Sequence, residues 1–185
     1  GEKKAHNRKL YEDAKERQQA ESNALYSQWR NRTISDTYEP GSVYKLFVAA
    51  AALEEGLVTP DYCFSCSGSV KVADNVLHCH KDGGHGRQTL AEGLMNSCNP
   101  FFVDIGQKLG SKNFYKYFDA FGFTSETDVD LPGEATPVKD VTYHSLENMG
   151  ISQVSSSSFG QTFQVSAIQM ITGVSAIANG GNLMQ

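Results

Sequence analysis

The chain has 185 residues, of which 39% are hydrophobic, and a formal net charge of −5. That length and that hydrophobic content are sufficient for one domain with a buried core. The charge is uneven, because residues 1–32 hold eight Lys or Arg against five Asp or Glu, whereas the remainder holds eight against sixteen. A mainly acidic body lacks the clustered cations that contact nucleic-acid phosphates, so we expect no nucleic-acid partner.

The N-terminal part of the chain predicts a helix that is separate from the main domain. Residues 1–30 are polar and rich in Ala, Glu, Lys, Arg and Gln, a composition that favours helix but offers few apolar anchors. We therefore predict a polar surface helix or N-terminal extension over 1–30 and a main domain over 31–185. The turn at Pro40-Gly41 precedes an apolar run that predicts a helix over 42–56.

Short strands and further helices follow along the chain. Alternating apolar residues with a turn at Asp74-Asn75 predict a β-hairpin over 66–80. Helical patterns predict a helical subdomain over 87–122, and a loop-rich segment follows over 123–158. A last helix is predicted over 164–179. The fold class expected from these elements is α+β and predominantly helical in this chain.

The sequence contains one Ser-x-x-Lys, formed by Ser42 and Lys45 at the start of the predicted helix over 42–56. Residues three apart on a helix share a face, so a hydroxyl and an amine would meet. A lysine can accept a serine proton only if its pKa falls, and the apolar residues around Lys45 favour the burial that lowers it. The alternative is an ordinary helix start, in which Ser42 is an N-cap.

A second polar motif, Ser97-Cys98-Asn99, lies where two predicted helices meet, and Pro100 enforces the break. The Ser97 hydroxyl can relay a proton and the Asn99 amide can bind a carbonyl group, whereas Cys98 is expected to be buried packing. A rival Ser-x-Asn over 111–113 is explained by helix capping.

The cysteines and histidines between the two motifs allow three interpretations. Cys66 and Cys79 flank the predicted hairpin, so they are a possible disulfide pair or adjacent thiols. The second interpretation is that they are unrelated cysteines of the core. The third interpretation is a zinc site formed by Cys63, Cys66, Cys79 and His80. Of these we favour the first, and we predict no metal and no cofactor. The glycines on both sides of His85 indicate a loop histidine.

Several segments together resemble the transpeptidase domain of class B penicillin-binding proteins. The resemblance covers roughly residues 29–182, and Ser-x-x-Lys and Ser-x-Asn are two of the three motifs of that family. The segments that carry it are YEPGSVYKLF, SCN, GGHG over 83–86, NPFF over 99–102, FGQTFQVSAIQM over 159–170 and AIANGG over 176–181.

The resemblance implies a serine D,D-transpeptidase that cross-links peptidoglycan. Ser42 would be the acylated nucleophile and Lys45 its proton acceptor, and Ser97 and Asn99 would line the cleft. The implied substrate is a peptidoglycan stem peptide ending in D-Ala-D-Ala, and β-lactam antibiotics would trap the serine. Implied partners are cell-wall synthesis proteins such as a glycosyltransferase. The implied location is the extracytoplasmic face of the bacterial cytoplasmic membrane, with an anchoring N-terminal span outside this chain.

The chain also departs from the family pattern. It contains no Lys-Thr-Gly, the third motif, and most of the central antiparallel sheet is expected to be missing. We therefore expect a fragment of a longer protein that is incomplete as an enzyme by itself. Two alternatives stay open: a β-lactamase or β-lactam-sensor relative, and a non-catalytic scaffold or metal-binding module.

Overall fold

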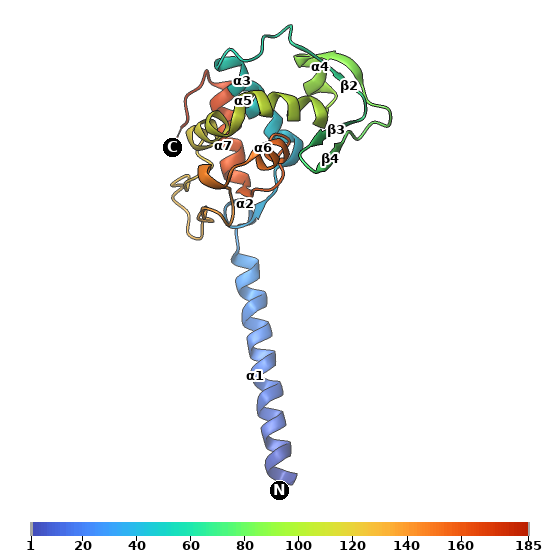
Figure 1. Cartoon of the computed structure of the whole chain (residues 1–185). Helices are drawn as coiled ribbons and strands as arrows, with labels where there is room; N and C mark the ends of the chain where they lie inside the picture. The colour runs from blue at the N-terminus through green and yellow to red at the C-terminus, as the bar shows by residue number, and fades with distance from the viewer. Residues whose placement is uncertain (1, 185) are drawn as a thin grey trace.

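The structure, a computed structural model, describes residues 2–184 and has two parts (Figure 1). Helix α1 (Glu2–Trp29) projects as a long arm with the N-terminus at its far end, and all other elements form one rounded body. The apolar residues Leu25, Tyr26 and Trp29 of this arm are exposed. Gly1, the first residue of the predicted N-terminal extension, and Gln185, the last residue of the predicted main domain, lie outside the described residues.

The body is mostly helical, and its strands are short. Its helices are α2 (Arg32–Ser35), η1 (Gly41–Tyr44), α3 (Lys45–Glu54), α4 (Leu90–Met95), α5 (Asn99–Ala120), η2 (Leu146–Asn148), α6 (Ile151–Ser157) and α7 (Ala167–Ala178). Its strands are β1 (Thr37–Tyr38), β2 (Cys63–Cys66), β3 (Ser69–Val72), β4 (Asn75–His78), β5 (Gly86–Thr89) and β6 (Val165–Ser166). The predicted α+β, predominantly helical class is confirmed.

The strands form three separate antiparallel pairs, β1 with β6, β2 with β5 and β3 with β4. The predicted hairpin over 66–80 is therefore wrong in its bounds, since the hairpin itself is β3 and β4. Cys66 belongs to β2 and pairs with Gly86 across the β2–β5 ladder. This second ladder also means that the predicted helical subdomain over 87–122 begins as a strand and becomes helical at Leu90.

Aromatic packing between α3 and α5 forms the centre of the body. Tyr44 at the start of α3 is buried, and its ring lies 4.7 Å from that of Phe163 and 5.3 Å from that of Phe47, centroid to centroid. Phe118 of α5 and Phe123 are also fully buried in this cluster. Burying such large apolar surfaces fixes α3 against α5, and with it the segment that carries Lys45.

Helix α5 bends at Gly110, whose positive φ of 71° ends one helical segment and begins the next. Pro100 stands in its first turn, where the missing N–H breaks no helical hydrogen bond. The predicted break between helices at this proline is therefore present, with Cys98 as the N-cap residue.

The predicted loop over 123–158 is wrong in one part, because it contains helix α6. Ser155, Ser157 and Ser158 are buried although they are polar. The Ser158 hydroxyl donates to the Val154 carbonyl, 2.6 Å away, and packs directly over Gly106 of α5, where a Cβ atom would overlap it. Small polar side chains therefore let α6 and α5 approach closely, a role that composition alone did not indicate.

The remaining helices differ from prediction only at their ends. The helix predicted over 42–56 begins as the 3₁₀ turn η1 and stays helical to Glu54. The last helix, predicted from residue 164, begins at Ala167 because Ser166 caps it and Val165 pairs with β1. Within residues 2–184, no helix combines the length and the apolar character that a membrane span requires.

Candidate active site

The segment before Ser42 is held by a turn that is distant in sequence. The Gly41 N–H donates to the Gly160 carbonyl at 2.9 Å, and the Thr162 N–H donates to Glu39 Oε1 at 2.9 Å. Gly160 has φ of +81°, and a Cβ atom there would overlap the Gly41 backbone. The two loops can approach this closely only because residue 160 is glycine, whereas Gly41 is favoured by its own positive φ of 60°. This contact fixes where Ser42 enters the body.

Four polar residues meet at the start of α3, and we call them the lysine cluster: Ser42, Lys45, Ser97 and Asn99. The Lys45 Nζ atom donates to Ser42 Oγ at 3.1 Å, to Ser97 Oγ at 2.9 Å and to Asn99 Oδ1 at 2.7 Å. It also donates to the Ser97 carbonyl at 2.7 Å. The structure thus brings together all four predicted catalytic residues, although the two motifs lie more than fifty positions apart in the sequence.

Ser42 and Lys45 differ in burial. Ser42 is exposed, whereas Lys45 is fully buried. Burial lowers the pKa of Lys45 to about 8, while the nearby Cys98 and Cys79 act in the opposite direction. Loss of hydration disfavours the ammonium form, so a neutral amine becomes accessible near physiological pH. A buried amine beside an accessible hydroxyl has the arrangement that proton abstraction requires.

The junction between α4 and α5 explains how Ser97 and Asn99 reach Lys45. Ser97 has an unusual positive φ of 48°, which turns the chain sharply between the helices. The Cys98 N–H donates to the Gly93 carbonyl at 3.0 Å, and Gly93 lies against the Phe101 ring, where a Cβ atom would be too close. Such local strain persists only where the surroundings enforce it, and it is concentrated at functional sites.

The rival Ser-x-Asn motif lies elsewhere. The Ser111 hydroxyl donates to the Met149 carbonyl at 2.5 Å, so it ties the second half of α5 to the η2 region. This contact supports a structural role for Ser111.

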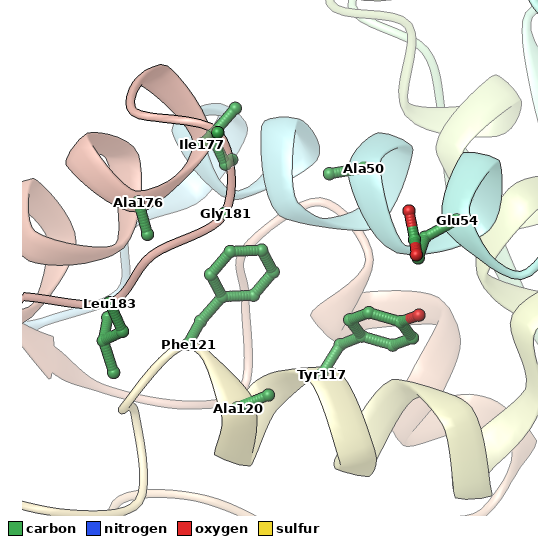
Figure 2. Close-up of a pocket in the computed structure, with 10 residues that line it drawn as sticks. Ala50, Glu54, Tyr117, Ala120, Phe121, Ala176, Ile177, Gly181 and Leu183 are labelled. Atoms are coloured by element: carbon green, nitrogen blue, oxygen red, sulfur yellow. The ribbon is translucent and has the colours of Figure 1, made fainter.

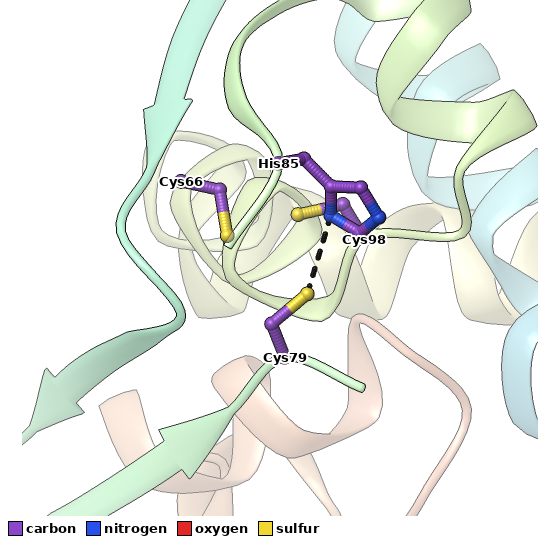
Figure 3. A group of neighbouring side chains, drawn as sticks. All are labelled: Cys66, Cys79, His85 and Cys98. Atoms are coloured by element: carbon purple, nitrogen blue, oxygen red, sulfur yellow. Dashed lines mark hydrogen bonds between the residues drawn. The ribbon is translucent and has the colours of Figure 1, made fainter. Parts of the chain in front are cut away.

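A second group of side chains lies behind the Ser97-Cys98-Asn99 segment, and we call it the thiol cluster. Its ligand-type atoms, three sulfurs and one imidazole nitrogen, all lie within 4.8 Å of one another. Its members are Cys66, Cys79, His85 and Cys98 (Figure 3). The less favoured zinc set considered from the sequence shares only Cys66 and Cys79 with this cluster. The Cys63 thiol instead donates a hydrogen bond to the Asp61 carbonyl, and the His80 ring makes an edge contact with the His85 ring.

Sequence reasoning missed His85 and Cys98 as partners because each belongs to a motif with another explanation. His85 lies in a glycine loop and Cys98 lies between two polar residues, so neither completes a familiar ligand spacing. All four cysteines of the described residues are free thiols. The predicted Cys66–Cys79 disulfide stays a prediction.

One hollow of the described residues lies away from both clusters. It has a volume of about 520 Å³ and is lined by α3, α5, α7 and the segment after α7 (Figure 2). Tyr117 and Phe121 line it at the end of α5, Leu183 lies beside Phe121, and Ala176 lines it from α7. No residue of the lysine cluster lines it. The candidate active site is therefore an open surface around Ser42 rather than this hollow.

Comparison with known proteins identifies the family. A family model described as the penicillin binding protein transpeptidase domain matches residues 3–185. Stage V sporulation protein D of Bacillus subtilis is 43% identical over 155 residues, which cover 83% of this chain and 23% of that protein. Penicillin-binding protein PbpB of Mycolicibacterium smegmatis is 30% identical over 158 residues, 83% of this chain and 23% of its own length. The chain thus spans about a quarter of these curated relatives.

Solved structures agree with this family. The transpeptidase domain of Burkholderia pseudomallei penicillin-binding protein 3 matches with a TM-score of 0.77 and 26% identity, covering 84% of this chain and 45% of that one. Penicillin-binding protein 3 of Mycobacterium tuberculosis, solved in complex with ampicillin, matches with a TM-score of 0.74 and 29% identity, over 82% and 32% of the two chains. The family match and these structural neighbours show that the chain belongs to the penicillin-binding protein transpeptidase family.

Proposed function

We propose that this chain is part of a peptidoglycan D,D-transpeptidase in which Ser42 forms the acyl-enzyme. The observation that carries the proposal is the buried Lys45 amine, which lies within hydrogen-bond distance of Ser42, Ser97 and Asn99. A hydroxyl next to a desolvated amine is the pairing that activates a serine without histidine. Similarity to proteins named D,D-transpeptidases supports the same reaction.

In the first step, the neutral Lys45 amine accepts the Ser42 proton as Oγ attacks the carbonyl carbon of the D-Ala-D-Ala amide. The carbonyl electrons move onto its oxygen, and the charge develops close to the first turn of η1. N–H groups in a first helical turn have no intrahelical partner and can donate to an oxyanion. Collapse restores the carbonyl, breaks the C–N bond and releases D-Ala.

The departing nitrogen needs a proton, and Ser97 is placed to supply it. Its hydroxyl lies 2.9 Å from Lys45 Nζ, so a proton can pass from the lysine to Ser97 and from Ser97 to the leaving amine. In the second step, an acceptor amine attacks the ester, the ester C–O bond breaks and Ser42 Oγ regains its proton. The net result is a new amide cross-link and an unchanged enzyme.

Asn99 is assigned to substrate binding. Its Oδ1 accepts from Lys45 at 2.7 Å, and its Nδ2 donates to the His78 carbonyl at the end of β4 at 3.4 Å. The second contact is long, so a substrate carbonyl can replace it as the acceptor. In this role Asn99 would hold the stem peptide beside the hairpin while Lys45 acts on Ser42.

The proposed location and partners follow from the family. The substrate lies outside the cytoplasmic membrane, so the longer protein would act on its extracytoplasmic face with an N-terminal membrane anchor. Glycan strands must be polymerised before they are cross-linked, which makes a glycosyltransferase the expected partner.

The test is the intact mass of the protein before and after exposure to benzylpenicillin. It uses this chain and a longer form of the protein that includes a Lys-Thr-Gly segment. We expect one stable adduct in the longer form, absent in Ser42→Ala and retained in Ser67→Ala, a control that removes another exposed hydroxyl.

An adduct that persists in Ser42→Ala, or none in the longer form, would contradict the proposal. Rapid hydrolysis of penicillin without an accumulating adduct would favour the β-lactamase alternative instead.

A further inference from the structure

We propose that a hollow between the β3–β4 hairpin and α6 binds the acceptor strand of the cross-linking reaction, an inference that rests on the proposed function. The hairpin and α6 lie side by side in the body (Figure 1). The hollow between them has a volume of about 370 Å³, within the roughly 300–1,000 Å³ of ligand sites. Val72, Asn75 and Leu77 line it from the hairpin, and Gln153 and Ser156 line it from α6.

Two walls of this hollow continue into the lysine cluster. Leu77 lines one wall, and the carbonyl of the next residue, His78, accepts from Asn99 Nδ2 at 3.4 Å. Thr162 lines another wall, and its N–H donates to Glu39 Oε1, in the turn that leads to the nucleophile. A molecule in the hollow would therefore lie beside the segments that carry both motifs of the cluster.

The second step of the reaction requires an amine to arrive on the side of Ser97. The amine nitrogen forms a bond to the ester carbonyl carbon, the ester C–O bond breaks, and the proton that the nitrogen loses passes through Ser97 and Lys45 to Ser42 Oγ. Lys45 Nζ lies 2.9 Å from Ser97 Oγ and 3.1 Å from Ser42 Oγ, so this transfer needs no large movement. Asn99, two residues after Ser97, contacts the end of β4. The strand that carries the amine can therefore extend past Asn99 into the hollow.

The lining suits the uncharged middle of a peptide. Of the described residues that line the hollow, none is Asp, Glu, Lys or Arg, so these residues offer no cation to a terminal carboxylate. The side-chain amides of Asn75 and Gln153 each contain a donor and an acceptor, which match the amides of a peptide main chain. Val72 and Leu77 supply apolar surface for a small side chain such as that of alanine. The D-Ala-D-Ala end of the donor strand carries a carboxylate, so the hollow suits the acceptor strand better.

Two further features of the hollow indicate that it binds a ligand. Thr162 has φ of +67°, which is rare for a β-branched residue, and its hydroxyl lies 2.9 Å from that of Ser156. Strain of this kind is concentrated at functional sites. The His144 side chain also lines the hollow, and its Nε2 atom is buried without a hydrogen-bond partner among the described residues. An unpartnered buried nitrogen costs free energy that a hydrogen-bonding ligand can offset.

The test is a competition between two acceptors for one acyl-enzyme, in the longer form of the protein. The donor is a thioester of N-benzoyl-D-alanine, which acylates Ser42 with loss of the thiol and is too short to fill the hollow. One acceptor is the tripeptide amide L-Ala-D-isoGln-L-Lys-NH₂, whose lysine side-chain amine attacks. The other is D-alaninamide, which has an amine but no peptide to occupy the hollow. Mass spectrometry gives the ratio of tripeptide product to D-alaninamide product.

This ratio reports how the hollow binds the peptide, because both products form from the same Ser42 ester. We expect Gln153→Ala, on the α6 side, and Asn75→Ala, on the hairpin side, each to lower the ratio about 3–10-fold, the effect of one lost hydrogen bond. Gln161→Ala, at an exposed glutamine outside the hollow, should keep the ratio of the unaltered protein. Since the two sides are tested separately, misfolding of one variant cannot decide the result.

The possible outcomes separate this inference from the proposed function. An unchanged ratio in both hollow variants would overturn the inference while acylation of Ser42 still supports the proposed function. A lower Tm with an unchanged ratio would also overturn it, and would indicate that another segment of the longer protein covers the hollow. An equal loss of both products would place the donor strand there instead. If the unaltered protein does not consume the thioester, the proposed function fails, and this inference fails with it.

Discussion

The lysine cluster and the thiol cluster share one segment of chain but differ in how their charges are balanced. Ser97 and Asn99 direct oxygen atoms to the Lys45 amine, so this cluster contains its own cation. Cys98, between them, directs a sulfur to two other sulfurs and an imidazole, and the Lys45 charge also acts on Cys98 and Cys79. The lysine cluster is held together by hydrogen bonds to one amine, whereas the thiol cluster brings sulfurs and an imidazole together behind it.

This difference teaches that consecutive residues of one motif can serve two sites. The positive φ of Ser97 turns the chain so that neighbouring side chains leave it on opposite sides. One side holds the contacts to Lys45 and the other side belongs to the thiol cluster.

Replacing the central cation should abolish the chemistry of the lysine cluster. Lys45→Met keeps the length and removes the amine, and we expect penicillin acylation to slow by about 10²–10⁴-fold, the usual contribution of a proton acceptor. The measurement is the acylation rate by intact mass, with Lys112→Met, at an exposed lysine, as the control. A change of less than tenfold would argue against Lys45 as the base.

Adding one methyl group at Gly84 should break the thiol cluster. Gly84→Ala places a Cβ atom on the Cys66 carbonyl, so we expect the free energy of unfolding to fall by about 1–3 kcal/mol more than in the control. Gly83→Ala is the matched control, since Gly83 also has a positive φ, of 73°, but no atom lies within 4 Å of its Cβ position. Both variants place an alanine at a positive φ, so the difference between their thermal melts reports the contact. Equal Tm values would contradict the packing argument.

The pH dependence of acylation should report the lysine cluster. Burial lowers the pKa of Lys45 to about 8, and only the neutral amine accepts a proton. Below that pKa the neutral fraction falls about tenfold for each pH unit, so the acylation rate should rise with pH and level off above about pH 8. Stopped-flow measurement between about pH 6 and about pH 9 tests this, with the far-ultraviolet circular dichroism spectrum as a check on folding. A flat profile would show that Lys45 is not the titrating group.

The smallest effect concerns the turn that holds Ser42. Glu39→Ala removes the acceptor for the Thr162 N–H, which should lower the free energy of unfolding by about 1 kcal/mol. For a chain of this size, Tm should fall by about 2–4 °C. Glu39→Gln keeps an oxygen acceptor and should lie closer to wild type in a thermal melt. An equal loss in both variants would indicate that charge, and not this hydrogen bond, matters at Glu39.

Much of the lysine cluster could be predicted because its two halves are local patterns. The i, i+3 spacing places Ser42 and Lys45 on one face of a helix wherever that helix forms. Pro100 likewise marks the break between two helices, and Ser97 and Asn99 lie at that break. Alternation and turn residues similarly located the β3–β4 hairpin. These features depend on backbone geometry over a few residues, so the sequence by itself determined them.

Other features depended on contacts between distant segments. The sequence could not show that Lys45 would be fully buried beside Ser97, because burial is set by how α3 packs on α5. The sequence also suggested His80 rather than His85 as the histidine beside the cysteines. Spacing along the chain cannot reveal that the close packing of Gly84 on Cys66 brings His85 next to the thiols. The buried serines of α6 were read as loop residues for the same reason.

The physical reason is one of range. Turn chemistry, helix spacing and proline breaks act over a few bonds, so they can be read along the chain. Ligand convergence and desolvation require several segments to occupy one place, and that placement is decided by packing of the whole body. The sequence alone therefore determined which groups this protein offers for chemistry, and only the tertiary structure decided that Cys98 faces three other ligand atoms while its two neighbours face Lys45.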